Sequence, residues 1–323
     1  MKKRILFLGG VLAFLMAGML TAGPPSMAAY PESPISLIVA YSPGGATDFQ
    51  ARIVTMMAGL DKYLGQPIVI INKPGAGGQV GWNWCIEKGT RDGYTMLAYN
   101  VPHFIAQSIV YKTKYNIRKF EPVANWGADP AVLIVPKNSP FNTLKDFIDY
   151  AKKNPRKITV SGAGMYVGHH IAFLQFSKAA GIKMTYIPEK GGVPAMQSVI
   201  AAKVKAGFNN LSDSFRNKDR IKILAVADLQ RHPFLPEVKT FKEMGVNVDD
   251  SSVNFRGVAF PKGVPQPIID KCAEIFPKMF RDKKVVKKMK MSGSPMRVMT
   301  RPEVINMFQE RETYLKTLIK KLK

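Results

Sequence analysis

The sequence predicts an α/β fold in which helices flank mostly parallel sheets. Two observations support this class. Short apolar runs at 35–40 and 67–71 are rich in β-branched residues, which is typical of strands covered on both faces. Each run ends in a glycine-rich turn, after which a helical pattern begins. The same order of strand, glycine turn and helix returns at 158–178 and 184–203, so one arrangement accounts for much of the chain.

The first of these units reads PISLIVAYSPGGATDFQ over residues 34–50. Its strand ends at the Pro-Gly-Gly of 43–45. Thr47 precedes Gln50 by three residues, which is the spacing of a capping box, and Asp48 adds an acid to the first helical turn. The helix should continue to Gly65, with an apolar face made by Phe49, Ile53, Met56, Met57, Leu60 and Leu64.

Both of the first two glycine turns place free backbone N–H groups at the positive end of a helix, and such groups bind anions. The second turn, Gly75-Ala76-Gly77-Gly78-Gln79, follows the strand at 67–71 and precedes a helix expected at 80–88. The two turns should therefore lie side by side at the edge where open α/β sheets bind ligands. The alternative is that Gly44 and Gly45 only form a tight strand-to-helix turn.

Three motifs, in this order, resemble the substrate-binding proteins of tripartite tricarboxylate transporters, the Bug family. They are YPESPISLIVAYSPGGATDFQAR, NKPGAGGQVG and RDGYTMLAYN, and weaker similarity continues through HIA and AAG at 170–181 to the GVP at 263–265. The resemblance covers nearly all of the chain after its first residues. It implies a periplasmic binding protein of the type II-like architecture, with two lobes and a small carboxylate in the cleft between them.

The resemblance also implies how the lobes divide the chain. Residues 29–128 would begin the first lobe, and residues 129–252 would form the second. The chain would cross back near residues 255–260, so that 253–323 would return to the first lobe with helices that pack on it. At least two crossing strands would then serve as the hinge.

Residues 1–28 are expected to be a cleavable signal peptide. Lys2, Lys3 and Arg4 precede an uncharged, mostly apolar stretch, and Ser26-Met27-Ala28 has the small residues of a cleavage site. A permanent anchor is the alternative, although the stretch is slightly short for a membrane span. A lipoprotein is less favoured because no cysteine lies near this site. Localisation in the periplasm follows from cleavage.

The net charge of +24 becomes +21 without the three basic residues of the leader. So basic a chain suggests nucleic acid as a partner. Its lysines are spread along helices and loops, however, and no recognisable DNA- or RNA-binding module occurs, so nucleic acid is not expected. The dense basic segment at 283–288 and 320–321 is interpreted as solvated helix, with attraction to anionic lipid or to an acidic transporter surface as the weaker alternative.

Enzyme signatures are missing from the sequence. It has no H-E-x-x-H, no G-x-S-x-G, and no complete nucleotide-binding motif, because Val80 stands where a dinucleotide fingerprint needs its third glycine. No metal is expected, because adjacent His169 and His170 point to different helix faces and make a poor metal pair. No cofactor is expected either, because no nucleotide-binding motif is complete. Cys85 and Cys272 either form one disulfide or remain two buried thiols. An enzyme of unknown type that acts on a small carboxylate in the same cleft remains the alternative function.

The glycine turns and the resemblance together predict the binding mode. One ligand carboxylate should dock between 43–48 and 75–79 on backbone N–H groups, directly or through water, as the family's water-mediated contacts imply. Tyr41 could cover the ligand, and the second lobe should read its distal end. His170 matches a histidine of the family and is either structural or a ligand contact. The predicted ligand-binding residues are Tyr41, Pro43, Gly44, Gly45, Ala46, Thr47, Asp48, Gly75, Ala76, Gly77, Gly78, Gln79, Ser161, Gly162, Gly164, Met165, His170, Gly191, Gly192, Asn209 and Asn210.

The ligand is expected to be a di- or tricarboxylate or another organic acid without an α-amino group. Family members that take amino acids need an acceptor for the ammonium group, and many relatives have Phe-Asp where this chain has Phe208-Asn209. The lysines at 190, 203 and 205 favour a second carboxylate or a neutral tail instead. The alternative is that Asp213 or Glu189 supplies the missing negative charge. The loaded protein should then meet a two-component membrane permease, as the resemblance implies.

Overall fold

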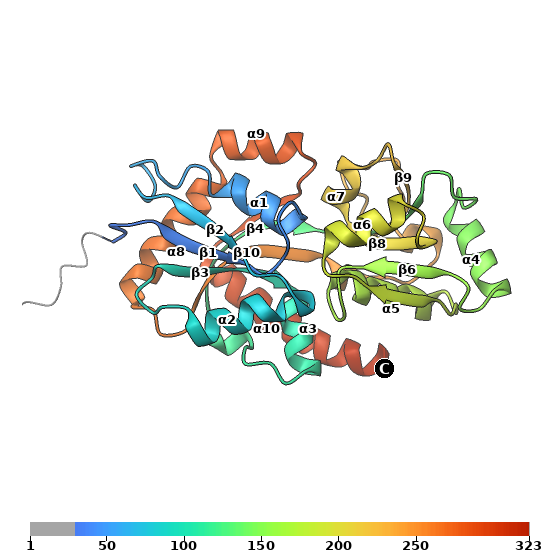
Figure 1. Cartoon of the computed structure of the whole chain (residues 1–323), viewed down its shortest axis with the longest axis horizontal. Helices are drawn as coiled ribbons and strands as arrows, with labels where there is room; N and C mark the ends of the chain where they lie inside the picture. The colour runs from blue at the N-terminus through green and yellow to red at the C-terminus, as the bar shows by residue number, and fades with distance from the viewer. Residues whose placement is uncertain (1–29, 323) are drawn as a thin grey trace, which may run out of the picture. The chain divides into compact units, whose positions relative to one another are not determined.

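A computed structural model describes residues 30–322 of the chain. The expected signal peptide, 1–28, lies outside the described residues. None of the helices among residues 30–322 is long and apolar enough to cross a membrane. Figure 1 shows the described chain with its helices and strands labelled.

The described chain forms two sheets, which confirms the predicted two-lobed α/β class. The first lobe contains a six-stranded sheet with the order β11-β4-β10-β3-β1-β2. Its strands are β1 (Ile35–Val39), β2 (Ile68–Asn72), β3 (Thr95–Val101), β4 (Phe120–Asp129), β10 (Asn254–Pro261) and β11 (Met296–Met299). The second lobe contains a five-stranded sheet with the order β7-β6-β8-β5-β9. Its strands are β5 (Ala131–Pro136), β6 (Thr159–Gly162), β7 (Thr185–Pro188), β8 (Ala206–Asn210) and β9 (Ile221–Ala227).

Both sheets are mixed, so the expectation of mostly parallel sheets was wrong in this detail. β1 pairs in parallel with β2 and β3, but β10 is antiparallel to both β3 and β4. In the second sheet β6 is parallel to β7 and β8, whereas β5 is antiparallel to β8 and β9. The reason is the crossing between lobes. The chain leaves the first sheet along β4 and returns along β10, and an outgoing and a returning strand that pair must run in opposite directions.

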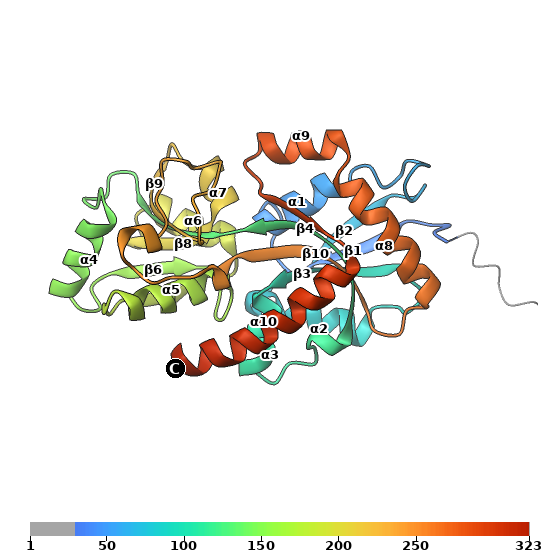
Figure 2. The ribbon, with the colours of Figure 1, turned by 180° about the vertical axis from the view of Figure 1, so that it is seen from behind.

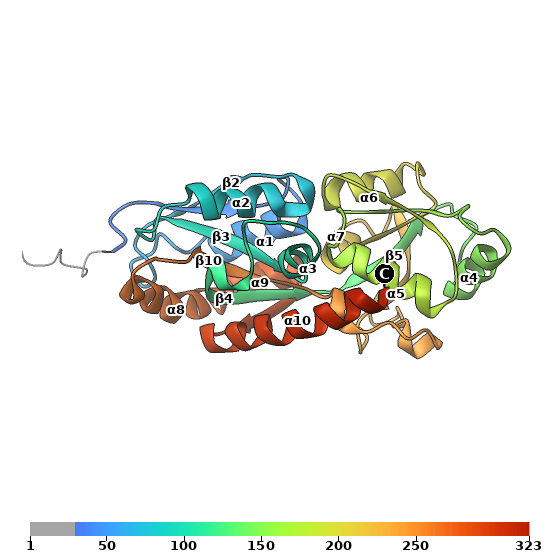
Figure 3. The same ribbon diagram turned by 90° about the horizontal axis from the view of Figure 1, so that it is seen from below.

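Helices cover both sheets (Figures 1 and 2). In the first lobe α1 and α9 lie on one side of the sheet, and α2, α3 and α10 lie on the other. Figure 3 shows α10 extending along the first lobe as far as α5 of the second, and these two helices are in contact. The helices of the first lobe are α1 (Ala46–Val54), α2 (Gln79–Lys88), α3 (His103–Val110), α8 (Gln266–Phe280), α9 (Lys283–Met291) and α10 (Arg301–Leu322). Those of the second lobe are α4 (Leu144–Lys153), α5 (Gly168–Ala179), α6 (Gly192–Ile200) and α7 (Leu211–Arg216).

The apolar run of β5 shows why an unbroken hydrophobic segment becomes a central strand. Leu133 and Val135 pack into one core cluster of the second lobe, whereas Val132 and Ile134 pack into the cluster on the opposite face. Successive side chains of a strand point to opposite faces, so a strand covered on both sides needs apolar residues at every position. Aromatic side chains fill the first of these clusters, among them Phe147, Phe176, Phe208 and Phe241.

The first helix differs from its prediction. It ends at Val54, and turns take the place of the expected helical continuation toward Gly65. Met56 and Leu60, expected on the buried face, are exposed. The capping box was also wrong, because Gly45 is the N-cap and no side chain caps the helix. The Thr47 hydroxyl is buried and instead accepts hydrogen bonds from Asn100 of β3 and Arg256 of β10. The buried residues of α1 are Ala46, Thr47, Asp48, Gln50, Ala51 and Val54.

Both cysteines are buried, and the structure favours two buried thiols over one disulfide, the two alternatives that the sequence left open. Cys85 is a free thiol in α2, so it does not form a disulfide with Cys272 of α8. Burial raises the pKa of the Cys85 thiol to about 12. The thiol is therefore protonated at neutral pH and unreactive as a nucleophile.

Candidate ligand-binding site

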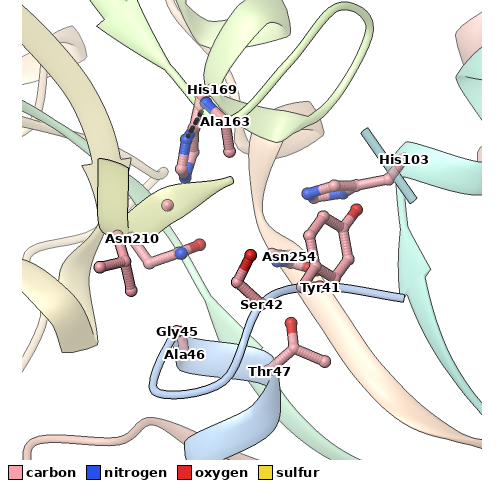
Figure 4. A pocket seen from close by; sticks show the side chains of 12 residues that line it. Tyr41, Ser42, Gly45, Ala46, Thr47, His103, Ala163, His169, Asn210 and Asn254 are labelled. Carbon is pink, nitrogen blue, oxygen red and sulfur yellow. Dashed lines mark hydrogen bonds between the residues drawn. The ribbon is translucent and has the colours of Figure 1, made fainter. Parts of the chain in front are cut away.

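A small cavity lies between the two lobes (Figure 4). Its volume of about 20 Å³ leaves room for one or two water molecules. The first lobe contributes the turn before α1, the start of α3 and the start of β10, and the second contributes the amino ends of α5 and α6 and the end of β8. The lining residues are Tyr41, Ser42, Gly45, Ala46, Thr47, His103, Ala163, His169, Gly192, Val193, Asn210 and Asn254.

Asp48 holds the first glycine turn in shape. Its Oδ2 accepts a hydrogen bond from the Gly44 N–H at 2.9 Å, and its Oδ1 accepts one from Asn72 Nδ2 at 2.9 Å. Arg52 forms an ion pair with the same carboxylate. Burial opposes ionisation of Asp48, but the hydrogen bonds from Arg52, Gly44 and Asn72 outweigh it and lower the pKa of this carboxyl. Asp48 does not line the cavity, so its charge stabilises the first glycine turn and does not contact a ligand there.

A fully buried arginine, Arg256, hydrogen-bonds to two of the residues that line the cavity. Arg256 of β10 has none of its side chain exposed, and its Nη1 pairs with Asp129 Oδ2 at 2.7 Å. Its Nε donates to Thr47 Oγ1 at 3.2 Å, and its Nη2 donates to Asn210 Oδ1 at 2.9 Å. Thr47 and Asn210 line the cavity from different lobes, so one guanidinium group orients polar side chains on both sides of the cleft.

Asparagines connect this cluster to the neighbouring strands. Asn100 of β3 donates from Nδ2 to Thr47 Oγ1 at 2.9 Å and to Asn254 Oδ1 at 3.1 Å. Asn254, at the start of β10, lines the cavity. Because Thr47 accepts from both Asn100 and Arg256, its hydroxyl proton is left to donate elsewhere.

The second glycine turn contacts the opposite lobe and is not among the residues that line the cavity. Gly77 O accepts hydrogen bonds from the Tyr41 hydroxyl at 2.9 Å and from Gln107 Nε2 at 3.2 Å. Gln107 Nε2 also donates to Met165 O, in the second lobe, at 3.1 Å. Gly77 has φ +66°, and a Cβ added there would lie 2.6 Å from Gln107 Nε2. The glycine is thus needed for the close packing of this turn against Gln107.

Two buried imidazoles face the cavity from opposite lobes (Figure 4). His103 comes from α3 and His169 from α5, and burial lowers the pKa of both, to about 4 for His169. Both rings are therefore neutral at pH 7. Among residues 30–322, no group of three or more histidine, cysteine, aspartate or glutamate side chains is arranged to hold a metal ion.

The structure brings together only part of the predicted site. Six of the predicted residues line the cavity, namely Tyr41, Gly45, Ala46, Thr47, Gly192 and Asn210. Six lining residues were not predicted, namely Ser42, His103, Ala163, His169, Val193 and Asn254. The predicted residues outside the lining are Pro43, Gly44, Asp48, Gly75, Ala76, Gly77, Gly78, Gln79, Ser161, Gly162, Gly164, Met165, His170, Gly191 and Asn209.

Three of the predicted residues outside the lining, Ser161, His170 and Asn209, make contacts within the second lobe. Ser161 Oγ donates to Ala195 O at 2.9 Å, and Asn209 Nδ2 donates to Gly192 O at 3.0 Å. The His170 ring lies 4.5 Å from that of Tyr186, centre to centre. The two hydrogen bonds fix the amino end of α6, which carries the lining residues Gly192 and Val193.

None of the twelve described lining residues carries a charge at neutral pH. Lys190, Lys203 and Lys205, which the sequence suggested for a second carboxylate, are exposed and lie outside the lining. The two candidate acids are also outside it: Asp213 accepts from Asn210 Nδ2 at 3.2 Å, and Glu189 accepts from Ser198 Oγ at 2.7 Å.

The buried histidines predict a loss of stability in mild acid. Burial lowers the pKa of His169 and of His170 to about 4, whereas an unfolded histidine has a pKa of about 6.5. Between pH 6.5 and 4 the unfolded chain binds protons that the folded chain excludes. The contribution of each neutral, buried histidine to the free energy of unfolding is therefore complete above pH 6.5 and is lost as pH falls toward 4. At pH 5 the loss should be about 2 kcal/mol per histidine.

Thermal unfolding of wild type and His170→Asn between pH 7.5 and 5 tests this prediction. The variant lacks one titrating ring, and its asparagine can still accept from the Tyr166 N–H as His170 Nδ1 does at 3.1 Å. Its stability should therefore fall less steeply with acidification. Equal slopes for the two proteins would contradict the assignment for His170.

A family model described as tripartite tricarboxylate transporter family receptor matches residues 51–323. Among known proteins, BugT from Bordetella pertussis is 29% identical over 264 residues, which cover 80% of this chain and 80% of BugT. The solved periplasmic binding protein BugD is 28% identical, with a TM-score of 0.84 over 91% of this chain and 98% of BugD. MatC from Rhodopseudomonas palustris, solved with bound malate, is 24% identical and has the same fold, with a TM-score of 0.80 over 90% of this chain and 100% of MatC.

Proposed function

Because this chain belongs to the family of tripartite tricarboxylate transporter receptors, we propose that it captures a small carboxylate without an α-amino group and delivers it to a two-component membrane permease. The chain is a solute-binding protein for carboxylates and not an enzyme. Its place of action is the periplasm, in keeping with the periplasmic binding protein BugD. Family membership supports the permease as partner.

The observation that carries the choice of ligand is the uncharged lining of the cavity. An α-ammonium group needs an acceptor, ideally a carboxylate, and no aspartate or glutamate is among the twelve described lining residues. Asp213 is near but already pairs with Arg216 and accepts from Asn210. A buried ammonium without a partner is strongly disfavoured, so amino acids should bind poorly.

We place the carboxylate at the amino end of α1, because Gly45, Ala46 and Thr47 line the cavity there. The first N–H groups of a helix have no partner within it, and its dipole favours an anion there. Ordered water can complete the contact. Each hydrogen bond to a charged group adds roughly 1.5–3 kcal/mol, so a few of them reach micromolar affinity, about −8 kcal/mol.

The lobes must separate before a ligand can enter, since about 20 Å³ is too little for a dicarboxylate. We place the hinge at the two crossings, around Pro130 between β4 and β5 and around Val253 before β10. Residues 129–252 would then move against 29–128 and 253–323. MatC holds malate, a dicarboxylate, in the same fold, which supports a two-ended acid as cargo.

A thermal-shift panel tests the proposal with malate, adipate, citrate and benzoate against aspartate and glutamate. A ligand at a hundred times its Kd stabilises the folded state by about 2.7 kcal/mol. At least one carboxylate without an amino group should give such a shift, and the amino acids should not. Mass spectrometry of the recovered ligand should find it chemically unchanged.

Two outcomes would contradict the proposal in different ways. The largest shift for aspartate or glutamate would show that the ammonium group finds an acceptor, and Asp213→Asn would then identify whether Asp213 supplies it. A product that accumulates with time would favour the enzyme alternative.

A further inference from the structure

His169 is held at the cavity with its ring orientation fixed by the backbone. It is the second residue of α5, it is 2% exposed, and it lines the cavity. The Ala163 N–H donates to its Nδ1 at 3.1 Å, which is the dashed line in Figure 4. Ala163 belongs to the turn between β6 and α5, so the lobe's own backbone sets the position of the imidazole.

This hydrogen bond also decides which nitrogen carries the proton. A nitrogen that accepts a hydrogen bond is unprotonated, and a neutral imidazole has its single proton on the other nitrogen. His169 is neutral at pH 7 because burial lowers its pKa to about 4. Its proton is therefore on Nε2, which makes Nε2–H a donor.

The Nε2 atom is buried and has no hydrogen-bond partner among residues 30–322. A buried donor without a partner costs free energy comparable to a lost hydrogen bond. Figure 4 shows this nitrogen directed toward the interior of the cavity, next to Asn210. Asn210 Oδ1 accepts from Arg256 Nη2 and has a second lone pair, but it makes no hydrogen bond of normal geometry to His169 Nε2.

We propose that His169 Nε2–H donates a hydrogen bond to a carboxylate oxygen of the ligand and that this residue determines specificity for carboxylates from the second lobe. The inference rests on the proposed function and adds the residue that contacts the ligand from the second lobe, opposite α1. A neutral donor suits this role, because the carboxylate gains a charge-assisted hydrogen bond without a second buried charge.

The neighbouring histidine provides the contrast. His170 Nδ1 likewise accepts a backbone hydrogen bond, from the Tyr166 N–H at 3.1 Å. Its ring, however, packs between Phe173 and Tyr186 and is not among the lining residues. Adjacent helix positions face different directions, so two similar imidazoles have different surroundings.

Two substitutions separate the two nitrogens of His169. In His169→Asn the amide oxygen can replace Nδ1 as acceptor for the Ala163 N–H, but the donor toward the cavity is lost. In His169→Gln the longer amide can place an N–H near the position of Nε2, while the contact to Ala163 is weakened. We expect His169→Asn to raise Kd about 10- to 100-fold with Tm nearly unchanged, and His169→Gln to lower Tm but to keep Kd within about threefold.

Calorimetric titration of the whole exported chain with malate, adipate and citrate measures these values, with His170→Asn as the matched control that should bind like wild type. Nitrogen-15 NMR of histidine-labelled wild type should show the proton of His169 on Nε2 and a shift of that resonance when the bound acid is added.

The outcomes separate this inference from the proposed function. If wild type binds one of the three acids and His169→Asn binds it equally well, the role of His169 is overturned and the proposed function stands. A proton found on Nδ1 in the wild-type protein overturns it as well. If wild type binds none of the three at millimolar concentration, a di- or tricarboxylate cargo is ruled out, and the inference fails with it.

Discussion

Gly45→Val is expected to weaken carboxylate binding at least 100-fold while the protein remains folded. Gly45 has φ −71° and ψ 164°, a conformation that valine adopts readily. A Cβ at this position would lie 3.6 Å from Ser42 O and 3.7 Å from Val193 Cγ2, which are ordinary contacts. The two methyl groups of valine, however, would occupy the cavity of about 20 Å³ and hold the carboxylate away from the first N–H groups of α1.

Titration with the acid selected by thermal shift, together with circular dichroism, measures this effect. Gly59→Val is the matched control, because Gly59 is exposed, lies outside the cavity, and would bring a Cβ no closer than 3.8 Å to Pro67. It should leave affinity unchanged. Wild-type affinity in Gly45→Val would mean that the first glycine turn only connects β1 to α1.

Asp129→Asn should lower the free energy of unfolding by about 3–5 kcal/mol, because it leaves the guanidinium group of Arg256 buried without a counter-charge. Asp129 and Arg256 are both fully buried and their side chains meet at 2.7 Å. Asp129 also accepts from the Ser212 N–H at 3.1 Å and from Gln50 Nε2 at 3.2 Å. Asparagine keeps the shape of the side chain but neither its charge nor its second acceptor oxygen.

Urea unfolding of wild type and variant measures the loss. Glu274→Gln is the control, since it removes the charge of an exposed ion pair with Lys278, whose side chains are 70% and 65% exposed, and such surface pairs contribute little to stability. Similar small losses of unfolding free energy in both variants would contradict the view that Arg256 needs the charge of Asp129 for the protein to be stable. Recovery of stability in an Asp129→Leu, Arg256→Met double variant would support that view.

Local order was predictable from the sequence, because each strand and glycine turn is determined by neighbouring residues. The strand at 35–40, the N-terminal turn at Gly45 and the helix at 80–88 all have counterparts in the structure. The mixed sheets could not be deduced from local pattern. Strand direction depends on where the chain crosses between lobes, and pairing partners such as β3 and β10 are far apart in the sequence.

The polar cluster around Arg256 shows the same limit within the site. Arg256 and Asp129 are 127 residues apart, and nothing in the residues next to either one indicates the other. The choice between His169 and His170 depended on the rotation of one helix, which a two-residue motif does not reveal. The second glycine turn did carry a recognisable motif, but its carbonyl contacts Tyr41 and Gln107, and sequence pattern does not distinguish that arrangement from one facing the cavity.

Because the lining of the cavity is uncharged, the association rate and the dissociation rate of a ligand should depend on different groups of the protein. A chain with a formal net charge of +24 attracts anions from a distance, and exposed lysines such as Lys190, Lys203 and Lys205 contribute to that field. Dissolved salt screens this attraction within about 10 Å at 0.1 M ionic strength. The hydrogen bonds inside the closed cavity are shielded from salt. Ionic strength should thus change the association rate of an acid and leave its dissociation rate almost untouched.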